Sequence, residues 1–331
     1  MPNHAASKPW AGKSRSAASY LTSLALQTYN RAVTQATPGG VSSLHEDRIL
    51  PMNRRSVIAG LGAVPAFAGV TFFLALVQCF CLGGGCLGLR MGRPAAVGGL
   101  CIIILLSVLL ASRFRPPSPE ADTAPGREAG PRGVRWIAWG VTGVALAGAA
   151  ALWVRLWRLA WLRPCYDWDG LYYHLPAISG WAAQGHVAWL NGGADVPFVN
   201  YPAGVEVTTF FMHLVFGTSR LATAGNLWYW PLAFLAVVVI ALLLGVHGPW
   251  RWVSGAWIAG ASGMVCQSVT CYTDPGFAAT AMGALAASGL LVFARGIPIP
   301  WRILLWGAAL GLLAGAKGTG APFAAVLAFS V

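Results

Sequence analysis

Residues 221–250 read LATAGNLWYWPLAFLAVVVIALLLGVHGPW and contain no Lys, Arg, Asp or Glu. A helix needs about 20 mostly apolar residues to cross the hydrocarbon of a bilayer, so this run is long enough to span a membrane. Other long runs also lack charged residues; they are 56–89, 94–112, 136–154, 252–273 and 275–294. Because a backbone that crosses lipid must satisfy its own hydrogen bonds, these runs predict an all-α polytopic membrane protein. A β-barrel, built from alternating segments of about 10 residues, does not fit them.

The composition supports the same class. Charged residues make up 10% of the 331-residue chain, against roughly 25% in soluble domains. The formal net charge is +12, but seven of the 22 basic residues lie in the first 55 positions and five more lie in 113–135. Such basic flanks are typical of cytoplasmic segments, and no basic patch interleaved with aromatic residues is present. We therefore attribute the charge to membrane topology and exclude a nucleic-acid partner.

Composition also divides the chain into four segments. Residues 1–55 are polar and predict a disordered cytoplasmic N-terminus. Residues 56–112 predict two accessory transmembrane helices, and the Pro-, Gly- and charge-rich residues 113–135 predict a cytoplasmic linker. Residues 136–331 form the main domain, which ends inside a short apolar run. From that ending we expect a C-terminally truncated protein.

The order of charges in the main domain predicts its topology. No Lys or Arg occurs from Pro164 through Ser219, which is typical of an extracytoplasmic loop. Later crossings are expected at 226–246, 253–272 and 276–294 and in the run before Lys317. Asp169, Asp274 and Lys317 are then each two crossings apart, so all three are expected at the outer face. The argument requires that the short apolar segment 207–219 lie on the membrane without crossing it.

The segment YDWDGLYYHLP (166–176) concentrates polar chemistry in this apolar chain. Its Asp167 and Asp169 form a DxD pair, which can bind a divalent cation or supply a general base. Solvated loop acids or a helix N-cap are the simpler interpretation. Tyr173 can stack on a sugar or belong to an interfacial aromatic belt. For His174 a hydrogen-bonding role is expected, because no clear metal ligand set accompanies it.

Asp274 and Lys317 are charged residues next to apolar runs. Asp274 precedes Pro275, a combination that favours the start of a helix, and a carboxylate at a membrane interface can also orient substrate or hold an ion. Lys317 is the only lysine after residue 13. An anionic lipid phosphate is a natural partner for it, whereas the simpler interpretation is a lysine that snorkels to the interface.

The seven cysteines do not predict a disulfide framework. Most of them lie inside apolar runs, where a cysteine usually behaves as a small hydrophobic residue. Cys79, Cys81 and Cys86 could suggest a metal site, but no histidine or carboxylate lies nearby in the sequence to complete it. We therefore favour packing as the role of the cysteines.

Four segments resemble a known family in the order in which they occur. DGLYYHLPAISGWAAQGHV (169–187) resembles the first outer loop of the GT-C superfamily of membrane glycosyltransferases, especially bacterial members akin to protein O-mannosyltransferases and lipopolysaccharide-core sugar transferases. NYPAGVEV (200–207) resembles the Pro-Pro-Gly-x-Glu segment of that family, with Ala203 in place of the second proline. TDPGFAATAMGALAASGLLV (273–292) and GLLAGAKGTG (311–320) resemble its Thr-Asp-x-Pro and Gly-Thr-Lys-x-Thr segments, with Pro275 directly after the Asp and Ala316 in place of the first Thr.

The resemblance implies a GT-C-like bundle of transmembrane helices with a long first extracytoplasmic loop. It also implies a cell-membrane enzyme that transfers a sugar from a polyprenyl-phosphate donor to a lipid, glycan or protein acceptor at the extracytoplasmic face. Asp169 would be the general base, and Lys317 would stabilise the leaving phosphate; a divalent cation at Asp167 and Asp169 is the competing arrangement. Tyr173, His174, Glu206 and Asp274 would bind substrate or orient the loop.

Two other functions compete with the enzyme. A transporter or lipid flippase would use Asp274 and Lys317 to line a pathway, and it predicts inverted repeats, which the sequence does not show. An inactive, truncated membrane protein is the other alternative.

Overall fold

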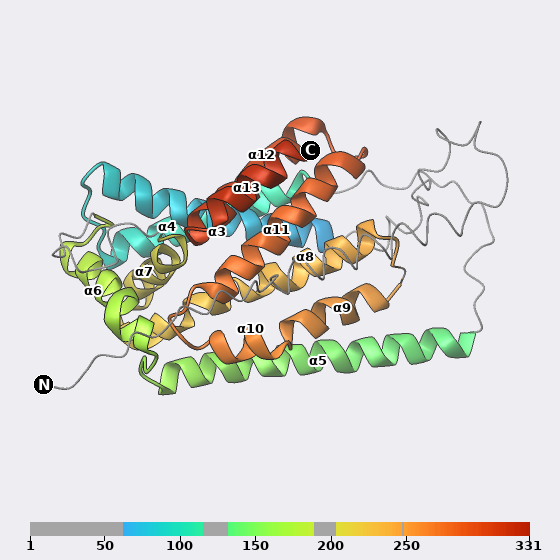
Figure 1. Ribbon diagram of the computed structural model, residues 1–331, viewed down its shortest axis with the longest axis horizontal. Coiled ribbons are helices and arrows are strands. Elements are labelled where there is room, and N and C mark those ends of the chain that lie inside the picture. The colour runs from blue at the N-terminus through green and yellow to red at the C-terminus, as the bar shows by residue number, and fades with distance from the viewer. Residues whose placement is uncertain (1–61, 115–131, 189–202, 247) are drawn as a thin grey trace, which may run out of the picture. The chain divides into compact units, whose positions relative to one another are not determined.

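The computed structural model describes residues 62–114, 132–188, 203–246 and 248–331. These residues are helical with short connections, and no strand occurs among them (Figure 1). The all-α prediction is therefore confirmed for the described part of the chain. The N-terminal segment 1–55 and most of the linker 113–135 lie outside it.

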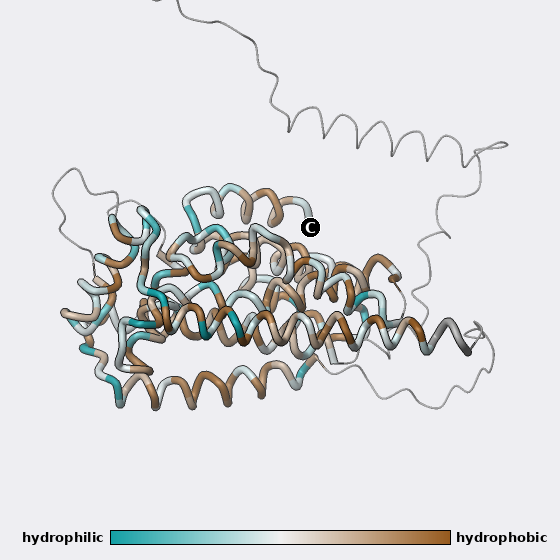
Figure 2. Tube along the Cα trace, turned by 90° about the horizontal axis from the view of Figure 1, so that it is seen from below, coloured by the Kyte–Doolittle hydropathy of each residue, from teal (hydrophilic) through white to brown (hydrophobic). Residues whose placement is uncertain are grey.

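Six helices are long and apolar enough to cross a membrane, which agrees with a helical membrane protein, and Figure 2 shows the many apolar residues along them. They are α3 (Ala63–Cys86), α4 (Arg93–Ser112), α5 (Arg132–Leu162), η3 with α8 (Ser219–Trp228 and Trp230–Leu243), α11 (Asp274–Phe293) and α12 (Ile299–Ala316). The shorter elements are η1 (Gly170–His174), α6 (Leu175–Gln184), α7 (Gly204–Phe216), α9 (Trp250–Ala259), α10 (Ser262–Gln267) and α13 (Gly320–Phe329).

The single transmembrane helix predicted over 253–272 is wrong. Instead of one continuous helix, α9 ends at Ala259 and α10 begins at Ser262, because Ala261 takes an extended-type backbone with φ −59° and ψ 135°. Each piece is too short to span hydrocarbon alone. In Figure 1 the two helices follow one another beside α5, and α9 contacts both α5 and α8.

Helix α7 also differs from its prediction. Its 13 residues are too few for a crossing, as expected. However, ten of them are buried, and α7 contacts α3, α4, α6 and η3. The helix is therefore an internal packing element, surrounded by other helices of the protein.

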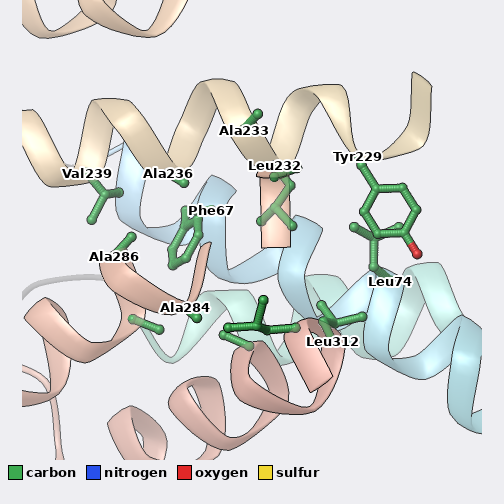
Figure 3. Close-up of a cluster of buried hydrophobic side chains, with 14 of the residues drawn as sticks. Phe67, Leu74, Tyr229, Leu232, Ala233, Ala236, Val239, Ala284, Ala286 and Leu312 are labelled. Atoms are coloured by element: carbon green, nitrogen blue, oxygen red, sulfur yellow. The ribbon is translucent and has the colours of Figure 1, made fainter. Parts of the chain in front are cut away.

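The main apolar cluster is built around α8. Tyr229 and Leu232 contribute to it from the start of this helix, Phe67 comes from α3, Ala284 from α11 and Leu312 from α12 (Figure 3). Many members of the cluster are alanines. In a lipid bilayer the hydrophobic effect does not drive helices together, and small residues stabilise helix packing because they let neighbouring helices approach closely. Helix α3 is thus part of the same cluster as the helices of the predicted main domain.

Contacts at both ends of α11 and α12 fix their relative direction. At one end, the side chain of Arg302 donates a hydrogen bond to the carbonyl of Leu291. At the other end, Lys317 pairs with Asp274. The two helices are therefore antiparallel, and the end of α12 meets the start of α11.

Candidate functional site

Asp167 is a buried acid that joins two distant segments of the chain. Its carboxylate accepts hydrogen bonds from the backbone amides of Gly170 (2.8 Å) and Cys271 (3.2 Å). Cys271 lies in the segment that leads into α11, whereas Gly170 begins η1. Asp167 therefore has the backbone-bonding role that an N-cap acid would have, and its oxygens are already engaged by the protein.

Asp169, two residues further on, has a different environment. It is half-buried, it precedes η1 with helical φ and ψ, and its side chain makes no cap hydrogen bond. Burial raises the pKa of Tyr272 above its usual range, and the charges of Asp169, Asp167 and Asp274 raise that pKa further. Asp274 follows Tyr272 by two residues in the chain, whereas Asp169 acts on Tyr272 from a different segment.

Asp274 and Lys317 form an ion pair between α11 and the end of α12. Asp274 lies in the first turn of α11 and Lys317 directly follows α12, so each charge is favoured by the dipole of its own helix. Pro275 follows at the start of α11, as its sequence predicts. The side chains are 46% and 34% exposed, respectively, so both remain accessible to a ligand. The parity prediction that Asp274 and Lys317 lie at the same end of the bundle is confirmed by this contact.

His174 and Glu206 meet beneath the exposed residues. His174 Nδ1 lies 2.7 Å from Glu206 Oε1, and both side chains are buried. The other oxygen, Glu206 Oε2, has no hydrogen-bond partner among the described residues. The pair borders a small cavity that it shares with Asn226 and Cys271, and this cavity has room for about one water molecule. The geometry favours the loop-orienting role over direct substrate contact.

Asn226 is a central residue that sequence reasoning missed. Its Nδ2 donates to the carbonyls of Thr270 (3.2 Å) and Tyr272 (2.5 Å), and its Oδ1 accepts from the amide of Gly276 (3.1 Å). These bonds fix the segment before α11, and the start of α11 itself, against η3. The sequence offered one clue to Asn226, which is the single Asn in the uncharged run 221–250. A polar side chain buried in such a run needs hydrogen-bond partners.

A second buried network holds the start of α7 in place. Gln78 Nε2 donates to the Gly204 carbonyl and to Tyr229 Oη, both at 3.0 Å, and Thr208 Oγ1 lies 2.8 Å from the same phenol oxygen. A Cβ at Gly204 would lie 2.6 Å from the carbonyl of Gly315. The close approach of α7 to the end of α12 therefore requires glycine at this position.

The aromatic residues of the loop differ in exposure. Tyr173 is half-buried and its ring centroid lies 4.1 Å from that of His174. Trp168 and Tyr172 are exposed and stack on each other at 4.6 Å. An exposed stacked pair is suited either to a sugar ring or to the lipid headgroup region.

The structure brings together a set of potential metal ligands that differs from the expected pair of Asp167 and Asp169. Among the described residues, ligand atoms of Cys165, Asp167 and Cys271 lie within 4.8 Å of one another, and this is the one group of three that does so. Asp169 does not belong to it.

Comparison with known proteins gives no relative: no family model, no curated protein and no solved structure matches this chain.

Proposed function

We propose that the chain is a membrane glycosyltransferase of the GT-C type, which transfers a sugar from a polyprenyl-phosphate donor to an acceptor hydroxyl at the extracytoplasmic face. The observation that carries the proposal is the Asp274–Lys317 ion pair. It joins two of the segments that resemble the family, and the charge of Asp169 from a third segment reaches Tyr272 beside them. The acceptor is a lipid, a glycan or a protein.

The reaction assigns one role to each charged residue. Asp169 takes the proton of the acceptor hydroxyl while the hydroxyl oxygen attacks the anomeric carbon of the donor sugar. The bond between that carbon and the phosphate oxygen breaks, and the polyprenyl phosphate leaves with the bonding electrons. Lys317 stabilises the negative charge that develops on the phosphate.

The geometry of Lys317 supports this role. An ammonium group has three N–H donors, and Asp274 engages it on one side only. Its partial exposure leaves room for a phosphate oxygen at the remaining donors. Asp274 then keeps the lysine extended toward the start of α11, which makes it a positioning residue.

The contrast between Asp167 and Asp169 supports the choice of base. Asp167 is buried and accepts hydrogen bonds from two backbone amides, which occupy its oxygens. Asp169 is half-buried and has no cap bond. A general base needs an oxygen that is free to accept a proton, which favours Asp169 over Asp167.

The test is transfer of radiolabelled sugar from a panel of polyprenyl-phosphate-linked hexoses in membranes that contain the chain. General-base catalysis contributes about 10²–10⁴-fold, so Asp169→Asn is expected to lower kcat at least about 100-fold without a change in thermal denaturation. Lys317→Met is expected to lower kcat as well. Asp167→Asn serves as the matched control. Because Asp167 has a structural role, the activity of this variant should fall only in proportion to the amount of folded protein that is lost.

Wild-type transfer by Asp169→Asn would overturn the assignment of the base. If wild-type membranes transferred no sugar yet moved labelled polyprenyl phosphate between leaflets, with Lys317→Met inactive, the proposal would fail in favour of a flippase.

A further inference from the structure

Two cysteines that the sequence interpretation treated as packing residues lie in contact. Cys165 is in the segment between α5 and η1, and Cys271 is in the segment between α10 and α11. Their sulfur atoms are 3.4 Å apart although 106 residues separate them in the chain. A disulfide has an S–S distance of about 2.0 Å, so the two sulfur atoms would have to approach one another to form the bond.

The backbone around the two sulfurs is held independently of them. Asp167 Oδ1 accepts the hydrogen bond of the Cys271 amide and also lies 3.5 Å from Cys165 Sγ. Asn226 holds the neighbouring carbonyls of Thr270 and Tyr272. Both cysteines are therefore brought together by hydrogen bonds, and bond formation orders little additional chain.

The other five cysteines lie in different surroundings. Cys79, Cys81 and Cys86 belong to α3, Cys101 to α4 and Cys266 to α10. Cys165 and Cys271 are thus the two cysteines outside helices, in the two segments that also hold the polar residues of the candidate site. These segments are expected at the outer face, and disulfides form and persist in oxidising compartments outside the cytoplasm.

We propose that Cys165 and Cys271 form a disulfide bond in the membrane-inserted protein, which joins the loop carrying Asp169 to the segment that leads to Asp274. This inference corrects the expectation that all cysteines serve packing alone. It rests on the outer-face location of both segments and does not depend on sugar transfer.

The oxidation needs a partner, which we take to be the disulfide of an extracytoplasmic dithiol oxidase. Cys165 is half-buried, whereas Cys271 is buried. Cys165 is therefore the thiol that the oxidant reaches first, and its thiolate is the nucleophile.

The exchange then balances in two steps. The Cys165 thiolate attacks one sulfur of the oxidant's disulfide, which forms a mixed disulfide and releases one thiolate of the oxidant. Cys271 gives up its proton and attacks the sulfur of Cys165, which releases the second thiolate. Two protons and two electrons have passed to the oxidant, which leaves as a dithiol.

The bond would fix the spacing between two parts of the candidate site. Asp169 follows Cys165 by four residues and Asp274 follows Cys271 by three. A covalent bond between the cysteines therefore limits how far the base can move from the Asp274–Lys317 pair. Without it, the segments are connected only by weaker contacts such as the Cys271–Asp167 hydrogen bond and the contact of the two thiols.

The test counts protected thiols in the full chain, isolated from cells with an oxidising exterior. Membranes are denatured with N-ethylmaleimide to block free thiols, then reduced, and newly exposed thiols are labelled with a polyethylene-glycol maleimide that shifts the band on a gel. Wild-type protein is expected to gain two labels, and mass spectrometry should find a linked peptide pair containing Cys165 and Cys271. Cys165→Ser and Cys271→Ser are each expected to gain none.

Cys266→Ser is the matched control, because it removes a cysteine from the adjacent α10 and should still gain two labels. The proposal is overturned if the wild type gains no label after reduction. It is also overturned if a chelator without reductant exposes both thiols, since that result assigns Cys165, Asp167 and Cys271 to a metal site. Neither readout involves sugar transfer, so this inference and the proposed function fail independently.

Discussion

Two groups of polar residues lie near the start of α11, and they differ in burial. The buried group consists of Asp167, His174, Glu206 and Asn226, each less than 9% exposed. The exposed group consists of Asp169, Tyr272, Asp274 and Lys317, each at least partly accessible. Carboxylates occur in both groups, so residue type alone does not tell them apart.

The difference in burial determines what each group can do. A buried polar side chain must find partners inside the protein. Asp167 and Asn226 bond to backbone groups of neighbouring segments, and His174 and Glu206 bond to each other. An exposed side chain can exchange its partner for a ligand at little cost. The buried group therefore builds the end of the bundle, and the exposed group is available for chemistry. Four substitutions test this division.

Asn226→Ala should have the largest effect on stability. It leaves the Gly276 amide and the carbonyls of Thr270 and Tyr272 without their partner. Each buried group left unsatisfied costs about 1–3 kcal/mol, so we expect a loss of about 4 kcal/mol, measured as a lower midpoint of thermal denaturation in lipid nanodiscs. Asn226→Asp keeps the shape but presents an acceptor to two carbonyls, and it should be at least as damaging. A mild Asn226→Asp would contradict the bonding scheme.

Gly204→Ala should have the second-largest effect on stability. Its new Cβ meets the Gly315 carbonyl at 2.6 Å, and overpacking of this kind costs about 1–3 kcal/mol. Gly311→Ala is the matched control on α12, because a Cβ at Gly311 meets no atom within 4 Å. The control is expected to leave the denaturation midpoint unchanged or to raise it, since alanine favours helix. Equal losses in both variants would show that α7 and α12 do not approach closely.

His174→Ala removes the partner of a buried carboxyl. Glu206 Oε1 then loses its 2.7 Å contact, which should cost about 2 kcal/mol in the same denaturation assay. His186→Ala is the control, because His186 makes its 3.1 Å contact to the Gln184 carbonyl in an exposed setting. If the two histidine variants denatured at the same temperature, the His174–Glu206 pair would not be a stabilising contact.

Asp274→Asn should have the smallest effect on stability, because exposed ion pairs contribute about 0–1 kcal/mol. Its effect should instead appear in binding. Weaker placement of Lys317 is expected to raise the Kd for vesicles that contain polyprenyl phosphate, as measured by flotation. If Asp274→Asn strongly lowered stability but left binding unchanged, the Asp274–Lys317 pair would have a structural role like that of the buried group.

The sequence predicted the membrane class and most of the spans because long uncharged runs have few alternatives in lipid. It also predicted the shared location of Asp274 and Lys317, since crossing parity needs only the number of helices between them. It did not predict the break between α9 and α10 or the burial of α7. Both depend on packing against neighbouring helices, which short apolar segments do not encode in their periodicity.

For the candidate site, the sequence by itself determined which residue types are present and in which segments. Asp167 and Asp169 looked equivalent there, as one DxD pair in a loop. Only the tertiary structure decided that Asp167 bonds to the backbone of a segment 104 residues away while Asp169 stays accessible. The same holds for Asn226 and for the contact of Cys165 with Cys271, because the identity of a buried group's partner is set by which segments the helices bring together.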